Sequence, residues 1–232
     1  TEQKVNKNLV EKFKQDYGFG EIISRLIISR NYHSSEVYGI NNSQKLINIF
    51  KNDKDFDKAS SILVNAINNN ENICILGDYD VDGACATSLL VRYFNYINQK
   101  HFFYIPDRTE DGYGASKKLF QKLILKKPKL IILVDCGSTS NEAIDYLNKH
   151  NVKSIIIDHH EINKPYPRSN VIINPKKELI EKEQSLLCAT ALTYFFLENL
   201  IEKTKSNFKI SNFLIYVLLA TICDVMPLRK IN

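Results

Sequence analysis

The sequence predicts an α/β fold, with a mostly parallel sheet covered by helices on both faces and a small helical segment before it. From residue 73 onward, short apolar runs alternate with stretches of helical apolar spacing. Continuous apolar runs of this length are typical of strands that are buried on both sides, as in parallel sheets. The expected strands are residues 73–76, 102–105, 130–134, 154–157 and 171–173.

The helical stretches define the expected domain organisation. Residues 1–58 form a helical N-terminal segment, with apolar helical spacing at 20–28 and 43–50. Residues 59–228 form the α/β domain, and residues 229–232 begin a linker to further domains. The helices expected around the sheet are 58–68, 84–98, 116–126, 141–150, 186–201 and 211–223.

Composition excludes several classes of protein. Hydrophobic content of 44% with 25% charged residues is ordinary for a globular chain, and a net charge of +5 permits a polyanionic partner without indicating one. The longest apolar run, 213–223, is shorter than the roughly 20 residues of a membrane helix, so we expect no membrane association. No cysteine pair has C-x-x-C spacing, which indicates reduced, buried thiols and a cytoplasmic protein. The five cysteines are Cys74, Cys85, Cys136, Cys188 and Cys223.

The segment DYDVDG, residues 78–83, directly follows the first expected strand. Its carboxylates Asp78, Asp80 and Asp82 occupy alternate positions, which point to one side in extended backbone. Three like charges held so close favour a hard divalent cation. Gly83 ends the extended segment, and a helix is expected from Ala84.

Two other acidic or glycine-containing motifs do not fit this segment. An EF-hand loop needs Glu at its twelfth position, where this chain has Leu89, and a P-loop needs Gly-Lys-Ser/Thr after Gly83. A solvated acidic turn or a metal site therefore remains, and other strand ends decide between them.

Further ligand-type residues follow other strands. Asp135 follows strand 130–134, and DHHE, residues 158–161, follows strand 154–157. In an open α/β sheet these ends share one edge, where binding sites form. Asp224 comes after the last helix, which we expect to be buried. The sequence therefore predicts a metal site at this edge.

The chemistry of this ligand set favours Mn²⁺ or Mg²⁺. Carboxylates with one or two histidines suit these ions, and HEINK at residues 160–164 lacks the second histidine of a zinc protease motif. The number of ligands indicates two ions, the arrangement that hydrolyses phosphoesters. PDRTEDGYG, residues 106–114, offers Arg108 and the turn Gly112-Tyr113-Gly114 for binding phosphate; an ordinary glycine-rich connector is the alternative.

Four motifs in this order resemble the DHH phosphoesterase superfamily: DYDVDG (78–83), VDCGS (134–138), DHHE (158–161) and ATICDVMPL (220–228). Together with PDRTEDGYG, the chain is similar to the RecJ-like branch, exonucleases that degrade single-stranded DNA from the 5′ end. The resemblance covers roughly residues 60–228. One departure is Ala189-Thr190-Ala191-Leu192, where that family has Gly-Val-Gly-Val.

The resemblance implies roles for individual residues. Asp135 would bridge two metal ions, Asp78 would complete or support the site, and His160 would contact the scissile phosphate; these three are the expected catalytic residues. The expected metal ligands are Asp78, Asp80, Asp82, Asp135, His159 and Asp224. The expected substrate-binding residues are Arg108, Gly112, Tyr113, Gly114 and His160.

The resemblance also implies a biological setting. The expected partner is single-stranded DNA in repair and recombination, with single-strand-binding protein and a helicase as further partners of a monomeric enzyme. Two alternatives stay open. One is a small-substrate DHH phosphatase or oligoribonuclease, and the other is a non-catalytic DNA-binding scaffold of the same fold.

Overall fold

A computed structural model describes residues 5–32, 34–41, 46–107, 109–111, 114–177, 183–229 and 232 of the chain. The chain forms two compact units, residues 1–47 and 48–232. The first unit contains α1 (Lys7–Tyr17), α2 (Glu21–Ser29) and α3 (Ser34–Asn41). Asn6 caps α1 by accepting hydrogen bonds from the backbone of Asn8 and Leu9.

The helix expected over residues 43–50 is wrong in the part that the structure describes, because residues 46–50 are not helical. The Asn48 side chain explains the difference. Its Oδ1 accepts from the backbone N–H of Phe50, and its Nδ2 donates to Asn199 Oδ1 at 2.8 Å. An asparagine side chain that accepts from a backbone N–H two residues further on competes with helix formation.

The second unit is built on a five-stranded sheet whose strands are all parallel, in the order β2-β1-β3-β4-β5. The strands are β1 (Ile73–Gly77), β2 (His101–Tyr104), β3 (Leu130–Val134), β4 (Lys153–Ile157) and β5 (Val171–Ile173). All five expected strands are present, with shifts of one residue at some ends. The apolar runs identify them well because the interior strands are buried throughout.

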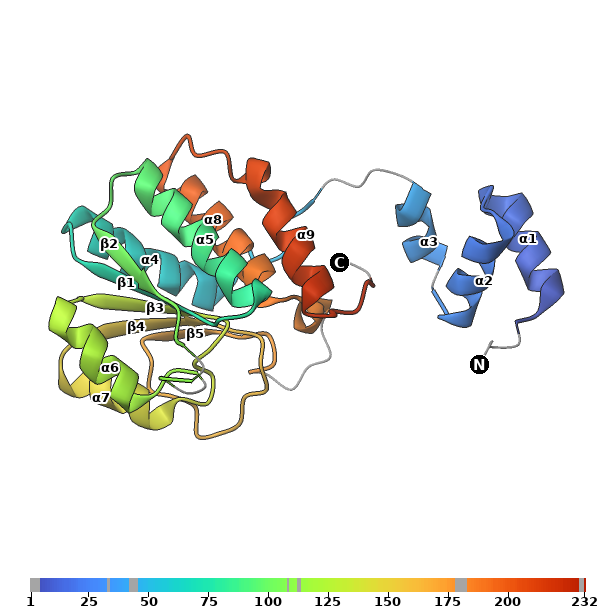
Figure 1. Ribbon diagram of the computed structural model, residues 1–232. Coiled ribbons are helices and arrows are strands. Elements are labelled where there is room, and N and C mark those ends of the chain that lie inside the picture. The colour runs from blue at the N-terminus through green and yellow to red at the C-terminus, as the bar shows by residue number, and fades with distance from the viewer. Residues whose placement is uncertain are drawn as a thin grey trace. The chain divides into compact units, whose positions relative to one another are not determined.

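Six α-helices surround the sheet in the described part of this unit (Figure 1). They are α4 (Lys54–Asn68), α5 (Val81–Tyr96), α6 (Lys117–Leu123), α7 (Asn141–Lys149), α8 (Ala189–Thr204) and α9 (Leu214–Cys223). Short 3₁₀ turns occupy Ile124–Lys126, Glu183–Leu186 and Ile210–Phe213. The expected boundary at residue 58 falls inside α4, whose cap is Asp53.

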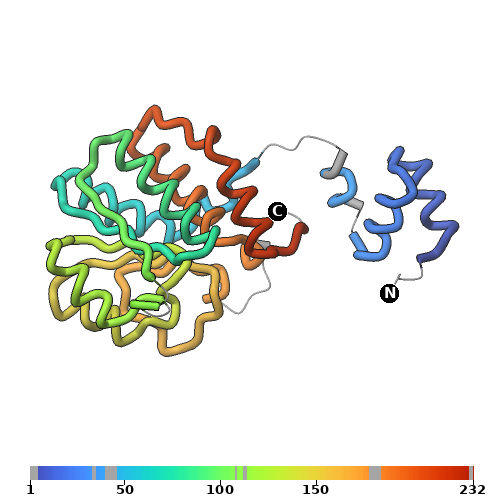
Figure 2. Tube along the Cα trace, in the orientation of Figure 1, coloured from blue at the N-terminus to red at the C-terminus, as the bar shows by residue number. Residues whose placement is uncertain are grey.

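Two hydrophobic cores lie on opposite faces of the sheet, as expected for helices on both sides. One face packs against α4, α5, α8 and α9, and the other against α6 and α7 (Figure 1). Alternate residues of β3 enter the two cores: Ile132 the first, Ile131 and Leu133 the second. The trace therefore passes from one face to the other between α5 and α6 (Figure 2).

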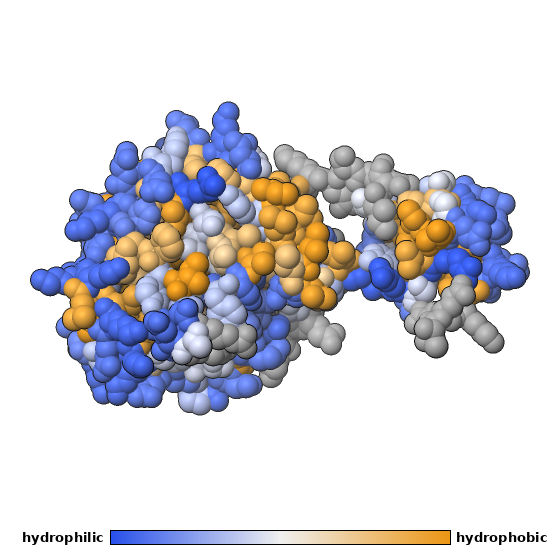
Figure 3. Space-filling model, in the orientation of Figure 1, coloured by the Kyte–Doolittle hydropathy of each residue, from blue (hydrophilic) through white to orange (hydrophobic). Residues whose placement is uncertain are grey.

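The expectation that the last helix is buried is wrong. α9 contacts α5 and α8 and buries Ala220, but its other face is exposed. That face forms an apolar patch (Figure 3) made by Leu214, Ile215, Leu218, Leu219 and Ile222. Cys223 is also exposed, although the other four cysteines are buried as expected. Among the described helices, none combines the length and the hydropathy that crossing a membrane requires.

Candidate metal centre

The pairing register of the sheet places the candidate residues side by side at the carboxyl ends of adjacent strands. Gly77 pairs with Val134, and Val134 pairs with Ile157. The residues that follow these positions are Asp78, Asp135 and Asp158, so three carboxylates leave the sheet at the same edge. The expected convergence of strand ends is therefore present in the structure.

DYDVDG reaches this edge by a different backbone path from the one expected. α5 begins at Val81, not at residue 84, so the segment is not an extended strand with alternating side chains. Asp80 is the N-cap, and its Oδ1 accepts from the Gly83 N–H at 2.9 Å. Asp82 lies in the first helical turn and is buried, whereas Asp80 is exposed. The strand-to-helix turn brings these carboxylates together.

Gly83 is required by this turn. A Cβ at residue 83 would lie 2.5 Å from the backbone oxygen of Asp78 and 2.6 Å from its nitrogen. Backbone atoms cannot yield as a flexible side chain can. Any larger residue would therefore push the first turn of α5 away from the end of β1 and separate Asp78 from Asp82.

Asp82 is fixed by the N-terminus of α8. Its two carboxylate oxygens accept from the backbone N–H groups of Ala189 and Thr190, both at 2.7 Å. Thr190 Oγ1 in turn donates to the Asp82 backbone oxygen at 2.8 Å. Free N–H groups at a helix N-terminus favour a negative charge. Because backbone N–H groups make these bonds, the contact needs no side chain at residue 189, and the structure gives the segment a role that the sequence did not.

Asp135 and His159 form the buried centre of the site. Asp135 has a left-handed backbone, with φ of 61°, and its N–H donates to the Ile157 oxygen. Both carboxylate oxygens of Asp135 and both ring nitrogens of His159 are buried without a hydrogen-bond partner in the described structure. Buried polar atoms are normally hydrogen-bonded, so four such atoms on two neighbouring residues fit a site that binds a further ligand.

Three carboxylates surround one nitrogen of His159. Its Nε2 lies 3.3 Å from Asp135 Oδ1, 3.5 Å from Asp224 Oδ2 and 3.6 Å from Asp82 Oδ2. Asp224, which follows α9, therefore joins the cluster as expected. Oxygen and imidazole donors in this arrangement suit Mn²⁺ or Mg²⁺ and need no sulfur ligand.

The donor atoms fall into three overlapping groups that can each hold a cation. The ligand atoms within each group lie within 4.8 Å of one another. The groups are Asp135–His159–His160, Asp82–His159–Asp224 and Asp78–Asp80–Asp135. Asp135 and His159 each belong to two groups, so more than one ion can share these side chains.

The electrostatics of the cluster favour a cation. Burial, together with the charges of Asp82 and Asp80, raises the pKa of Asp135 to about 10. Burial is also the main cause of raised pKa values at Asp78 and Asp224. A raised pKa means that each carboxyl holds its proton more tightly than a free aspartate does, whereas a bound cation would favour the ionised forms that act as ligands.

Asp158 holds the neighbouring His160 in place. Its Oδ1 accepts from His160 Nδ1 at 2.8 Å and from the His160 backbone N–H at 3.1 Å, while Oδ2 accepts from the Ser138 N–H. Burial alone would raise the pKa of Asp158, but the bonds from His160 and Ser138 hold it below its usual value. The bond to Asp158 raises the pKa of His160, whose side chain is 42% exposed.

Asn174 extends this network, and the sequence did not identify it. It follows β5 at the same level at which Asp158 follows β4, and its Nδ2 donates to Ser138 Oγ and to the His160 backbone oxygen. The signal that could have found it is its position directly after a strand. Glu161, by contrast, points to Lys176 and is 82% exposed, so it does not join the cluster.

The expected phosphate-binding segment is described only in part. Arg108, Gly112 and Tyr113 lie outside the described residues. Gly114 has a left-handed backbone, with φ of 69°. Asp111 accepts from Tyr104 Oη and Lys122 Nζ, both at 2.6 Å, which ties this segment to β2 and α6.

Residues 72–222 match the sequence profile of the DHH family, N-terminal domain. The chain belongs to the DHH family. The RecJ single-stranded-DNA-specific exonuclease of Dickeya dadantii strain 3937 is 28% identical over 186 residues, which cover 75% of this chain and 32% of that protein. RecJ of Escherichia coli strain K12 is 29% identical over 187 residues, 76% of this chain and 32% of that protein. The chain thus spans about a third of the length of these relatives.

Two solved structures of RecJ have the same architecture. A structure of exonuclease RecJ bound to manganese matches with a TM-score of 0.70 and 28% identity, over 77% of this chain and 45% of that chain. RecJ of Thermus thermophilus in complex with Mn²⁺ matches with a TM-score of 0.75 and 21% identity, over 98% of this chain and 32% of that chain. The chain is therefore a RecJ-like DHH domain in sequence and fold.

Proposed function

We propose that this DHH-family chain is a metal-dependent phosphodiesterase that removes nucleotides from the 5′ end of single-stranded DNA, using two Mn²⁺ or Mg²⁺ ions. The observation that carries the proposal is the buried pair Asp135 and His159, whose four side-chain oxygen and nitrogen atoms have no hydrogen-bond partner in the described structure. The similarity to RecJ exonucleases supports the choice of substrate.

The proposed metal ligands are those whose atoms converge: Asp78, Asp80, Asp82, Asp135, His159 and Asp224. When bound, the ions would lower the pKa of a water molecule and neutralise charge on the phosphate. Asp135 is the residue that would serve both ions, because it belongs to two of the three groups. The helix contact at Asp82 orients its carboxylate before any ion binds.

His160 is the proposed substrate-contacting residue. Asp158 accepts from its Nδ1, which fixes the ring and leaves Nε2 as the nitrogen for the substrate. The raised pKa of His160 favours the protonated ring, which can donate to a phosphate oxygen. Arg108 and the turn at residues 112–114 are proposed to bind a phosphate of the strand. The resemblance also suggests a cytoplasmic repair role with single-strand-binding protein and a helicase.

The test is release of mononucleotides from 5′-labelled single-stranded DNA in Mn²⁺, in Mg²⁺ and in chelator. We expect metal-dependent release by the wild type and none by Asp135→Asn. Asp145→Asn is the matched control, because Asp145 lies on α7, pairs with Arg168 and belongs to none of the three ligand groups. Cleavage in chelator, or normal cleavage by Asp135→Asn, would contradict the proposal.

The same assay separates the alternatives. A short oligoribonucleotide cleaved in preference to DNA would place the chain with the small-substrate phosphatases. A wild-type chain that binds no Mn²⁺ by direct metal analysis would be a non-catalytic scaffold.

A further inference from the structure

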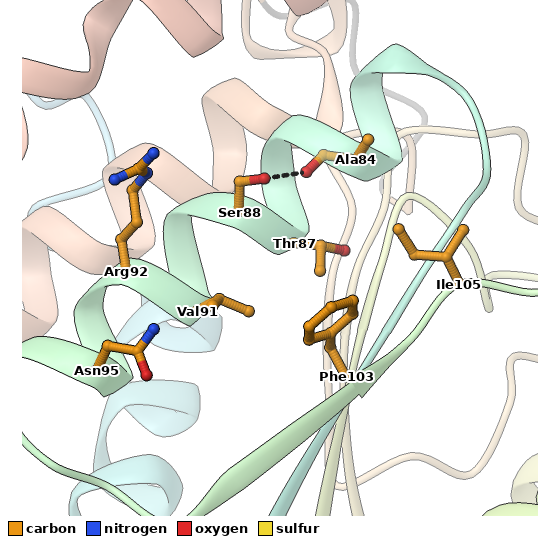
Figure 4. Close-up of a pocket in the computed structure, with 8 residues that line it drawn as sticks. All are labelled: Ala84, Thr87, Ser88, Val91, Arg92, Asn95, Phe103 and Ile105. Atoms are coloured by element: carbon orange, nitrogen blue, oxygen red, sulfur yellow. Dashed lines mark hydrogen bonds between the residues drawn. The ribbon is translucent and has the colours of Figure 1, made fainter.

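A groove runs along α5 beside the edge strand β2 (Figure 4). Its volume is about 390 Å³. Val91 of α5 and Phe103 of β2 point towards one another across it, while Arg92 and Asn95 lie at one end (Figure 4). The full lining is Ala84, Thr87, Ser88, Val91, Arg92, Asn95, Phe103 and Ile105.

The groove leads away from the proposed metal centre. Its first lining residue, Ala84, comes two positions after Asp82, and its N–H donates to the backbone oxygen of Asp80 at 3.0 Å. Arg92 lies about 12 Å further along the same helix, at 1.5 Å of rise per residue. A chain bound in the groove would therefore start at the carboxylate cluster and end at a cation.

Arg92 is held in position but is not neutralised. Its Nε donates to Tyr216 Oη at 2.9 Å, and its guanidinium lies over the rings of Phe213 and Tyr216 at 5.3 Å and 5.5 Å. Within the described residues, no carboxylate forms an ion pair with it. A fixed guanidinium without a carboxylate partner is well suited to binding phosphate.

The rest of the groove suits a nucleobase better than a charged group. Phe103 is 53% exposed and Ile105 is 36% exposed, although both side chains are apolar. None of the described lining residues is acidic, in contrast to the metal cluster beside the groove. An exposed aromatic ring next to a cation is the combination that binds single-stranded nucleic acid through stacking and phosphate contacts.

We propose that this groove binds the single strand beyond the scissile phosphodiester, with Phe103 stacking on a base and Arg92 binding a backbone phosphate. The inference rests on the proposed nuclease function and assigns a second contact region to the same substrate. An extended peptide is the other class of ligand that binds beside an edge strand. A neutral peptide would leave Arg92 without a counter-charge, so the charge distribution favours the nucleic acid.

The first test compares substrates of different length. The variants are Arg92→Gln and Phe103→Ser, with Lys149→Gln and Leu125→Ser as controls on exposed sites outside the groove. For a longer deoxyoligonucleotide, each groove variant should raise KM at least several-fold. For a dinucleotide, which cannot reach from the metal centre to Arg92, KM and kcat should stay at the wild-type values. Equal effects on both substrates, or no effect on either, would overturn the proposal.

The second test measures binding without turnover. The full chain is titrated with fluorescent oligothymidylate in chelator at several salt concentrations. Arg92→Gln should lower the salt slope of log K by about 0.7, the value for one phosphate contact on a single strand. Phe103→Ser should weaken binding with little change in slope, because a stacking contact releases no counterion. Unchanged slope in Arg92→Gln would count against the phosphate contact.

The two tests separate the groove from the proposed function. If the wild type cleaves DNA and the groove variants behave as wild type, the nuclease proposal stands and the groove proposal fails. If the wild type cleaves nothing, but binds oligothymidylate with the predicted variant effects, the groove proposal stands and the nuclease proposal fails. Binding of a neutral extended peptide in the groove, without binding of DNA, would overturn the nucleic-acid assignment.

Discussion

Replacement of Asp135 by asparagine should stabilise the metal-free protein. The folded chain holds this carboxyl with a pKa of about 10, against an ordinary value of 3.8. At pH 7 the group is therefore protonated in the folded state and ionised in the unfolded state, so folding must take up a proton. The difference of about 3 pH units corresponds to a loss of about 4 kcal/mol in the free energy of unfolding.

The direction of the pKa shift at Asp135 determines how this loss of stability depends on pH. Because the folded-state pKa is raised, the penalty is absent below pH 3.8 and grows as the pH rises towards 10. Asparagine has nearly the same shape and no charge, so Asp135→Asn should remove the penalty. In a domain of this size, a gain of up to 4 kcal/mol raises Tm by roughly 8–16 °C.

The assay is thermal unfolding in chelator at pH 4, 6 and 8, repeated with Mn²⁺. Asp135→Asn should match the wild type at pH 4 and exceed it increasingly at pH 6 and 8. Mn²⁺ should raise the Tm of the wild type and raise that of the variant far less, because binding to the folded state stabilises it. Glu142→Gln, at an exposed ion pair, is the control. A variant less stable than the wild type in chelator at pH 8 would refute the reasoning.

Two further predictions concern residues around the site. Gly83→Ala should lower the free energy of unfolding by about 1–3 kcal/mol and reduce Mn²⁺ affinity, because its Cβ meets the Asp78 backbone; denaturant titration and metal titration check this. Gly20→Ala, where a Cβ has open space, should keep the wild-type Mn²⁺ affinity. Asp158→Asn should lower the free energy of unfolding by about 1–3 kcal/mol at pH 7, with the difference shrinking below pH 4, since its folded-state pKa is lowered. An equal loss at pH 7 and pH 3 would contradict this assignment.

The strands were predictable because their residues pack alternately into the two hydrophobic cores, which makes each strand a short, continuous apolar run. β3, for example, sends Ile132 to one face and Ile131 to the other, so every position must be apolar. Helix starts were less predictable. α4 and α5 begin three or four residues before the expected positions, because the caps Asp53 and Asp80 accept from backbone N–H groups at their first turns.

Most of the candidate ligand residues could be proposed from the sequence because they follow strands, but the contacts that support them depend on the register of the sheet. Asp78, Asp135 and Asp158 are level because β1, β3 and β4 pair without offset, which sequence patterns do not specify. The α8 contact to Asp82 joins residues far apart in the chain. The prediction that α9 is buried was wrong because it used only the apolar composition of the helix, which does not say which elements pack against it.

The spread of the cluster from Asp78 to Asp224 has a kinetic consequence. Its donors come from the ends of β1, β3, β4 and α9, so the complete set forms only after the sheet and α9 have packed. Parallel strand pairing of this kind is slow because its contacts are distant in sequence. A cation that binds only the native arrangement of these side chains does not stabilise the transition state for folding. Mn²⁺ should therefore leave the refolding rate unchanged and slow unfolding, giving the protein a longer native lifetime.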